Sequence, residues 1–279
     1  MLSLTRFGTC LFLAAAALSI VSPAAAGQAP GRVVSMNVCT DQLAMLIAGE
    51  GQLHSVSVLA SDPSTSVMVR QAKRYVANHA LAEEIFLMEP DLVLAGTFSP
   101  RATVGLLRRL GFRVEEFAPA RSFGDVRENI TRIGELLGRR QRAAELVAGL
   151  DRGLAALQQA PASGKTIALS DSNSYTTGTG TLADEIFQAA GLTNIAEKLG
   201  VAGTVRLPME LLIMAKPDMI AISNHDYGAP ALAQENFVHP AYRALGAKAQ
   251  MVEVPVPNMI CGAPFTLEAA TILQKAAAQ

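Results

Sequence analysis

The stretch EEIFLMEPDLVL at residues 83–94 decides the fold, because a second copy of its pattern, ELLIMAKPDMIA, stands at residues 210–221. In both copies a Glu stands seven residues before a Pro-Asp pair, and an apolar run follows that pair. A proline ends a helix, because it lacks the N–H group and clashes with the preceding turn, and an apolar run behind it is typical of a buried strand. Each half of the chain is therefore predicted to contain a helix, a tight turn and a strand. This repetition indicates two similar α/β lobes.

The two acids of the pattern, Glu83 and Glu210, are expected in the first turn of their helices. A carboxylate is stabilised there by the N-terminal end of the helix dipole. Two interpretations are open. The acids are either surface residues favoured by local helix physics, or a pair of carboxylates that the two lobes present on one outer surface to a partner.

The N-terminal segment has the layout of a secretory signal peptide. Arg6 precedes an apolar run at residues 10–21, which is too short to span a bilayer, and small residues follow at 24–26. We expect cleavage after Ala26 and export of a soluble mature protein to a bacterial periplasm. Loss of residues 1–26 would leave 22 basic and 24 acidic residues. This balance argues against a nucleic-acid or anionic-membrane partner.

The rest of the chain alternates strand and helix patterns, with a helical segment in the middle. We expect strands at 33–34, 55–59, 92–95 and 112–117, and then at 165–169, 219–222 and 251–254. Between residues 122 and 159, apolar residues recur at three- and four-residue steps, which predicts two helices with a break at Gly138. The second would run about 20 residues, or about 30 Å. The predicted fold is α/β, with two Rossmann-like lobes at 27–119 and 163–279 joined by a helical connector at 120–162.

Motifs of catalysis and phosphate binding are weak or absent in the sequence. It contains no Gly-x-Ser-x-Gly and no His-Glu-x-x-His motif. The stretch at 177–181 has two Gly residues, but it lacks the Lys-Ser/Thr ending of a phosphate-binding loop. We interpret it as a loop that enters a helix, and nothing in the sequence argues for an enzyme.

Ligand-binding candidates come from the loops that follow strands, because open α/β sheets place ligands at the carboxyl ends of their strands. A single His in such a loop is more often structural than functional. The same two interpretations, a structural residue or a ligand contact, are open for His79, which precedes the first repeated helix. The candidate cleft residues are Asn37, Cys39, Thr97, Phe98, Ser99, Asn173, Tyr175, His225, Tyr227, Met259 and Cys261.

The cysteines of the mature chain are Cys39, after the first strand, and Cys261, after the last. Three interpretations are open: a disulfide, favoured by an oxidising compartment; two unpaired small residues; or a cleft-facing pair that touches a ligand. The spacing gives no support to a zinc site.

Taken together, several features resemble the class III periplasmic substrate-binding proteins of ABC importers, which deliver vitamin B12, ferric siderophores and haem. These are the opening Val33-Val34-Ser35, the doubled pattern, Ala190-Gly191-Leu192-Thr193-Asn194, the helical connector and the exported N-terminus. The resemblance covers nearly the whole mature chain.

The resemblance implies that a long helix limits the hinge motion of the lobes and that the ligand lies between them. It also implies that Glu83 and Glu210 dock onto Arg residues of a membrane permease, which works with an ATPase. The protein would be a non-enzymatic monomer that meets the membrane only through the permease. It would have no cofactor, because the metal arrives inside the chelate.

The ligand is narrowed further by composition. The B12-binding members of the family that this chain resembles line the cleft with aromatic residues, Trp included, whereas this chain has no Trp, which weakens a corrinoid assignment. Its cleft loops have no Arg cluster of the kind expected for an anionic catecholate chelate. Haem would need an axial Tyr or His. A ferric siderophore is therefore favoured, a corrinoid comes next and haem last. The rival hypotheses are a chelatase-like enzyme on a similar two-lobed scaffold and a binder that signals to a membrane receptor.

Overall fold

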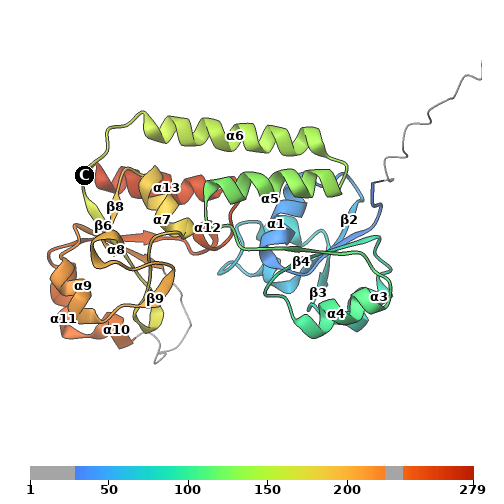
Figure 1. Cartoon of the computed structure of the whole chain (residues 1–279), viewed down its shortest axis with the longest axis horizontal. Helices are drawn as coiled ribbons and strands as arrows, with labels where there is room; N and C mark the ends of the chain where they lie inside the picture. Colours follow the sequence, from blue (N-terminus) through green and yellow to red (C-terminus); the bar gives the residue numbers. More distant parts are fainter. Residues whose placement is uncertain (1–28, 224–234) are drawn as a thin grey trace, which may run out of the picture.

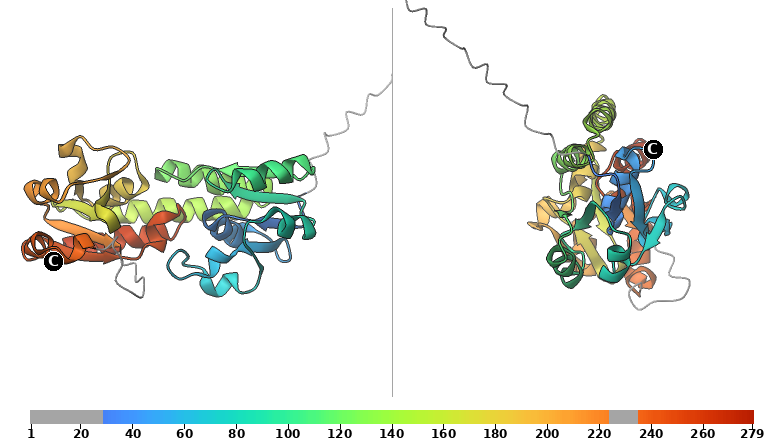
Figure 2. Two further views of the ribbon diagram at one scale, coloured as in Figure 1. Left: turned by 90° about the horizontal axis from the view of Figure 1, so that it is seen from below. Right: turned by 90° about the vertical axis from the view of Figure 1, so that its right-hand side faces the viewer.

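The structure, a computed structural model, describes residues 29–223 and 235–279. The expected signal peptide at 1–26 and the cleft candidates His225 and Tyr227 lie outside the described residues. The described chain forms two lobes, each built on a parallel β-sheet, which lie side by side along the longest axis of the molecule (Figures 1 and 2). The predicted α/β class with two lobes is confirmed.

The N-terminal lobe is a five-stranded parallel sheet with the order β3-β2-β1-β4-β5. Its central strands β1 and β4 are buried along their whole length and, apart from Ser35, carry no polar side chain, because helices cover both faces of the sheet. The strands are β1 (Val33–Ser35), β2 (Leu53–Ser57), β3 (Val76–Asn78), β4 (Leu92–Gly96) and β5 (Val114–Phe117). The helices are α1 (Val38–Ile47), α2 (Val69–Ala72), α3 (Ala82–Leu87) and α4 (Arg101–Arg109), with a 3₁₀ turn η1 at Val58–Ser61.

The C-terminal lobe contains a four-stranded parallel sheet with the order β11-β10-β6-β8. Its strands are β6 (Thr166–Ser170), β8 (Thr193–Asn194), β10 (Met219–Ser223) and β11 (Gln250–Val254), and an antiparallel pair is formed by β7 (Tyr175–Thr177) and β9 (Thr204–Arg206). Its helices are α7 (Leu182–Ala189), α8 (Ile195–Leu199), α9 (Met209–Ala215), α10 (Glu235–Val238), α11 (Pro240–Gly246), α12 (Pro257–Ile260) and α13 (Thr266–Ala277), with η2 at Ser172–Ser174.

The two Pro-Asp pairs of the repeated pattern have the same structural role. Asp91 accepts hydrogen bonds from the backbone N–H groups of Gly31 (2.9 Å) and Arg32 (2.8 Å) at the entry to β1. Asp218 accepts from the backbone N–H and the hydroxyl of Thr166, both at 2.7 Å, at the entry to β6. Each Asp therefore ties the strand that it opens to the first strand of its own lobe, and the predicted repeat of helix, turn and strand is confirmed.

The connector consists of the antiparallel helices α5 (Phe123–Leu136) and α6 (Arg140–Gln158). Ser122 and Asp125 form a capping box at the start of α5. Gly138, with φ of +67°, lies in the break between the helices, as predicted. Helix α6 packs on α5 through Gly134 and Ala143, and Nε of Arg142 donates a hydrogen bond to the carbonyl oxygen of Leu46 in the N-terminal lobe (3.0 Å). At its other end, α6 packs on α13 of the C-terminal lobe through Gly153 and Leu267. One helix thus spans both lobes along one side of the molecule (Figure 1).

Two details of the first lobe differ from the sequence-based expectation. The strand expected at 55–59 lies at Leu53–Ser57, since Leu53 pairs with Val33, and Val58 and Leu59 turn outward into η1. Strand β3 was missed, because two of its three side chains are exposed at the sheet edge and leave no apolar run. Within the described residues no helix is both long enough and apolar enough to cross a membrane.

Candidate functional site

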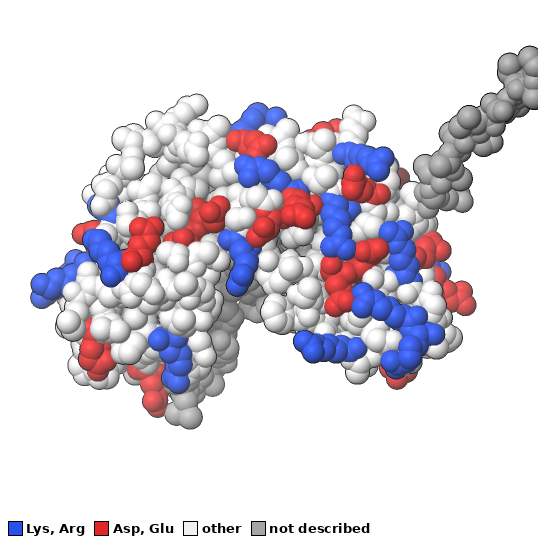
Figure 3. Space-filling view, viewed as in Figure 1, with Lys and Arg blue, Asp and Glu red and all other residues white. Residues whose placement is uncertain are grey.

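A cavity of about 100 Å³ lies where the N-terminal lobe meets the C-terminal lobe. In a space-filling view the surface is hollowed between the lobes on the side opposite α6 (Figure 3). We call this space the cleft cavity. Its walls come from the carboxyl ends of β1, β4 and β5, which is the edge at which open α/β sheets bind ligands. The lining residues are Asn37, Cys39, Thr40, Leu43, Gly96, Thr97, Phe98, Phe117, Ala118, Pro119, Ala120, Asn129, Ile260 and Gly262.

Asn37 is fixed in the wall of the cleft cavity by its own helix. Its Oδ1 accepts a hydrogen bond from the backbone N–H of Cys39 (3.1 Å), which makes Asn37 the N-cap of α1. Gly96 lets Asn37 occupy this place, because a Cβ atom at position 96 would lie 2.8 Å from Nδ2 of Asn37. The cap uses the side-chain oxygen, so the amide nitrogen is the group available to an occupant of the cavity.

The loop after β4 contributes a polar and an aromatic side chain. Thr97 and Phe98 line the cleft cavity, and Phe98 is 85% exposed. Ser99, the third candidate of this loop, is buried, and its Oγ accepts a hydrogen bond from the backbone N–H of Gly96 (3.0 Å). Ser99 therefore holds the turn and does not line the cavity, whereas the exposed ring of Phe98 offers a flat apolar surface.

Cys39 and Cys261 form a disulfide between the two lobes, with their Cα atoms 5.1 Å apart. This pairing confirms the disulfide interpretation and rules out two unpaired thiols. Next to the bond, Gly262 packs so closely on the connector that an added Cβ would lie 2.5 Å from Cβ of Ala120 and 2.7 Å from Cγ2 of Val126. Because Cys39 also lines the cleft cavity, the bond lies in the cavity wall. Its contact with a ligand stays a prediction.

The candidates of the C-terminal lobe are less closely gathered. Tyr175 is 42% exposed and lines a separate recess of about 10 Å³ together with Ser174 and Asn236. Asn173 has a left-handed backbone, and its carbonyl oxygen accepts a hydrogen bond from Nε of Arg206 (3.1 Å). Met259 is half-buried against the apolar core and does not line the cleft cavity. Asn173, Tyr175 and Met259 therefore do not line the cleft cavity, and Cys261 reaches its wall through the bond to Cys39.

His79 is engaged by a neighbouring acid. Its Nδ1 lies 2.9 Å from Oε1 of Glu84, and its backbone N–H donates to Oε2 at 2.7 Å. The hydrogen bond from the His79 backbone, together with that from the ring, holds the pKa of Glu84 below its usual value. His79 therefore has a local structural role, the contact with Glu84 at the start of α3.

The two repeated acids lie where the pattern predicted them. Glu83 is in the first turn of α3 and Glu210 is in the first turn of α9, and both side chains are exposed. Neither carboxylate has a side-chain hydrogen bond or ion pair with the described part of the chain. Both are available to a cationic partner.

Several lining residues were missed by sequence analysis. Phe117 is the last residue of β5 and residues 118–120 follow it, so the rule that selected the other strand-end loops would also have found them. Asn129 and Ile260 lie within helices, where no sequence signal marks a side chain that faces a cavity. Across residues 29–223 and 235–279, no group of three or more His, Cys, Asp or Glu side chains is arranged to hold a metal ion.

Parts of the chain are similar to curated proteins. A cobalamin-binding protein of Halobacterium salinarum is 26% identical over 196 residues, which are 68% of this chain and 53% of that protein. An uncharacterised ABC transporter substrate-binding lipoprotein of Bacillus subtilis, YvrC, is 28% identical over 156 residues, or 51% of this chain and 48% of that protein. The chain thus spans about half the length of the curated relatives that it matches.

A solved structure and a family model extend these similarities. A possible iron-binding, periplasmic solute-binding protein of Staphylococcus epidermidis matches with a TM-score of 0.73 and 17% identity, covering 90% of this chain and all of that one. At this identity the likeness shows the fold alone. The model of a family described as periplasmic binding protein matches residues 33–250. With the paired parallel sheets, the connector and the cleft between the lobes, this match shows that the chain belongs to the periplasmic binding protein family.

Proposed function

We propose that this protein is the substrate-binding component of an ABC importer, and that it captures a metal chelate between its lobes and delivers it to a permease. A ferric siderophore is the favoured ligand and a corrinoid the next. The observation that carries the proposal is the cleft cavity, in which the carboxyl ends of three strands meet residues 260 and 262 of the other lobe.

The chemistry of the lining supports an uncharged chelate. None of the described residues that line the cleft cavity is charged; the polar groups are amides and hydroxyls, and the remainder is largely apolar. A small number of neutral polar groups in an apolar pocket fixes the orientation of a ligand without demanding a counter-charge. Ferric trihydroxamates are neutral complexes, whereas ferric tricatecholates carry several negative charges that would be left unpaired in such a cavity.

The cleft cavity is too small to enclose a whole chelate. About 100 Å³ is well below the range of roughly 300–1,000 Å³ that is typical of small-molecule sites. The exposed ring of Phe98 stands at the edge of this space. Because the Cys39–Cys261 bond holds the lobes together at the cavity wall, we expect the ligand to extend beyond this space toward the open side of the cleft and to place an apolar face on Phe98.

Export to the periplasm is supported by the disulfide, because such bonds persist in oxidising compartments. The metal would arrive inside the chelate, and the protein itself would act as a monomer without catalysis. Glu83 and Glu210 would dock onto cations of the permease, since charge-assisted carboxylate–guanidinium pairs fix orientation as well as add affinity. Each exposed pair would contribute only about 1 kcal/mol.

The test of the ligand uses purified protein that begins at residue 27. Thermal unfolding is followed with a ferric trihydroxamate, a ferric tricatecholate, cyanocobalamin, cobinamide and haemin, each titrated separately. A saturable rise in the unfolding temperature is expected with the trihydroxamate, because a ligand that binds only the folded state stabilises it. Phe98→Ala should weaken that response, and Phe86→Ala, the same change at a partly exposed ring on α3 outside the cavity, serves as its control. A response to the tricatecholate alone would contradict the neutral-chelate argument.

The test of delivery uses uptake of the labelled chelate by exporting cells. The double variant Glu83→Gln/Glu210→Gln should lower uptake while the purified variant keeps its affinity for the chelate. Equal loss of chelate affinity in this variant would contradict docking. Conversion of the chelate by the purified protein would favour the chelatase-like enzyme instead.

A further inference from the structure

Two large apolar side chains are highly exposed next to Glu83 and Glu210. Leu87 is 79% exposed on α3, and Met214 is 74% exposed on α9. Each follows the acid of its own helix by four residues, Leu87 after Glu83 and Met214 after Glu210. Side chains four residues apart are neighbours on one face of a helix. Each lobe therefore presents one carboxylate and one apolar side chain together, and we call each such pair a patch.

Core packing does not explain these two side chains. The inward positions of the same helices are taken by Ile85, which is fully buried, and by Leu212, which is 6% exposed. Helices α3 and α9 thus already have an apolar face toward their sheets, and Leu87 and Met214 lie outside it. A single exposed apolar residue is ordinary, but a repeated one beside an unpaired acid marks an interaction surface.

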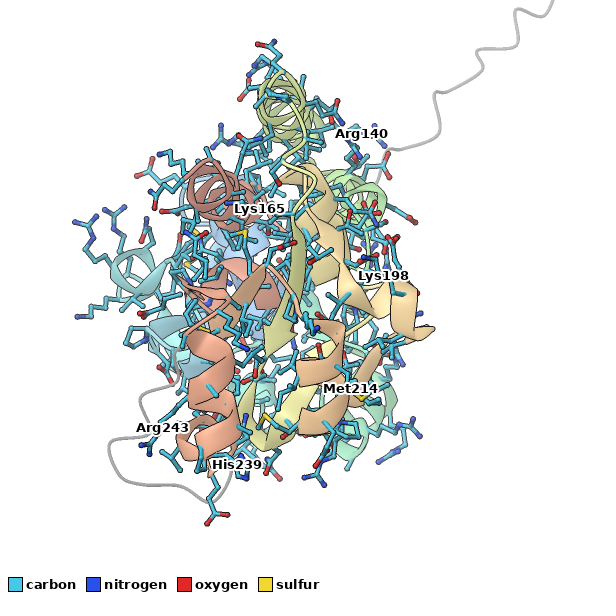
Figure 4. The ribbon with its side chains drawn as sticks, turned by 90° about the vertical axis from the view of Figure 1, so that its left-hand side faces the viewer. Arg140, Lys165, Lys198, Met214, His239 and Arg243 are labelled. Carbon is cyan, nitrogen blue, oxygen red and sulfur yellow. A yellow bond between two sulfur atoms is a disulfide. The ribbon has the colours of Figure 1, made fainter. Side chains whose placement is uncertain are left out.

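The two patches lie on the same side of the molecule. Helices α3 and α9 are at opposite ends of its long axis, and both are on the side away from α6 (Figure 1). Seen from the end of the C-terminal lobe, Met214 lies in the lower half with His239 and Arg243, while Arg140 of α6 is at the top (Figure 4). The cleft opens on this same side (Figure 3). One flat partner could contact both patches across the cleft opening.

We propose that Leu87 and Met214 are apolar anchors for the permease, and that each enters an apolar recess next to the cation that pairs with Glu83 or Glu210. This inference rests on the proposed function. Because the patch occurs once in each lobe, the partner must offer two matching sites, as a pair of related membrane subunits does. The acids would set the register, and the apolar side chains would supply most of the affinity, since exposed ion pairs contribute little and buried apolar area contributes more.

A second copy of this chain is a weaker occupant. Pairing of like patches would bring the carboxylates of both copies into one interface, and Glu83 and Glu210 have no ion pair with any described cation of their own chain to offset that repulsion. A basic and apolar surface complements both features of each patch. The experiment below therefore also measures the oligomeric state of the purified protein.

The experiment measures binding to the permease–ATPase complex, isolated from host membranes by cross-linking to wild-type protein and then placed in lipid nanodiscs. The variants are Leu87→Ser, Met214→Ser, their double, and Glu83→Gln/Glu210→Gln. Each single serine variant should weaken binding to the nanodiscs about 10-fold, and the double about 100-fold, if the two separate anchors act independently. The exchange Leu87→Met/Met214→Leu keeps the apolar character and should restore binding relative to the serine double.

The salt dependence of binding to the nanodiscs separates the contribution of the acids from that of the apolar side chains. Screening at about 0.5 M NaCl should shrink the penalty of the glutamine variant and leave the penalty of the serine double in place. The thermal response of every variant to the ferric trihydroxamate should match that of the wild type, because neither α3 nor α9 lines the cleft cavity.

The outcomes distinguish this inference from the proposed function. If the serine double binds like the wild type while the glutamine variant does not, the anchors are refuted and docking stands. If no permease complex binds the wild type, both fail together. If the serine variants turn a dimer in solution into a monomer, the patch is an interface between copies of this chain, and the inference is wrong.

Discussion

Glu89 and Lys216 share the same left-handed backbone, with φ of 47° in both, and each stands directly before the proline of a Pro-Asp pair. This conformation ends α3 and α9 and turns the chain into β4 and β10. For any residue with a Cβ atom, this backbone conformation is less stable than the right-handed one by about 1–2 kcal/mol, because the Cβ approaches the following carbonyl oxygen. Only glycine adopts it freely. The repeated pattern therefore contains a strained residue in each lobe, in addition to the acid, the proline and the aspartate.

Glycine at these two positions should stabilise the protein. We expect Glu89→Gly and Lys216→Gly each to raise the free energy of unfolding by about 0.5–1 kcal/mol, since relief of strain exceeds the added entropy of the unfolded chain. Urea unfolding monitored by circular dichroism measures the change. The matched control is Gly111→Ala, at φ of +90°, which should lower stability by a similar amount. Destabilisation by both glycine variants would contradict the argument.

The buried Asp41 should make stability depend on pH. Burial raises the pKa of Asp41 from 3.8 to about 6, and hydrogen bonds from Ser57 to its carboxylate offset this only in part. The pKa of Asp41 is higher in the folded state than in the unfolded state. The free energy of unfolding is therefore unaffected by this group below pH 4 and decreases as the pH rises to about 6. The loss is on the order of 3 kcal/mol.

Asp41→Asn tests this dependence. The wild type should lose stability relative to Asp41→Asn between pH 4 and 6.5, and the gap should stay constant at higher pH. Chemical denaturation at pH 4, 5, 6 and 7.5 provides the measurement. Asp125→Asn, at the half-buried cap of α5, is a useful comparison for an aspartate outside the core. A gap that does not change with pH would rule out titration of Asp41 as its source.

The disulfide should contribute strongly to stability. It closes a loop of 222 residues, and constraint of so long a loop in the unfolded chain stabilises the native state by about 3–5 kcal/mol. Cys39→Ala/Cys261→Ala should therefore unfold at clearly lower urea concentration, and reduction of the wild type should reproduce the shift. Mass spectrometry of unreduced, alkylated protein comes first. Alkylation of both cysteines would show that the bond does not form.

The contact of Gly262 with the connector should not tolerate a methyl group. Gly262→Ala would place a Cβ about 1 Å too close to Ala120 and Val126, and the overpacking should lower stability by about 1–3 kcal/mol. Gly105→Ala makes the same chemical change in α4, where the nearest atom is 3.5 Å from the added Cβ, and should raise stability slightly through helix propensity. Equal effects of the two substitutions would show that the lobe contact is loose.

The sequence predicted the lobes, the connector and the positions of Glu83 and Glu210, because those features follow from local rules. Apolar runs mark parallel strands, Gly138 marks a break, and the doubled pattern marks the repeat. Thr97 and Phe98 were found because they directly follow a strand. The C-terminal candidates fared differently, since the direction in which Tyr175 or Met259 points depends on tertiary packing. Residues on helices, such as Asn129, join the cleft cavity only through the approach of one lobe to the other, which no local pattern encodes. Ligand contact itself stays a prediction for every cleft residue.

The bond between Cys39 and Cys261 also changes the topology of the molecule. Most of the chain, including the connector and every described strand except β1, lies between these two residues and forms a closed covalent ring. A protease that cuts once anywhere within this ring leaves both products attached to each other. A nicked molecule would therefore migrate as one species on a non-reducing gel and separate into two only after reduction, and it could keep its lobes together in an environment rich in proteases.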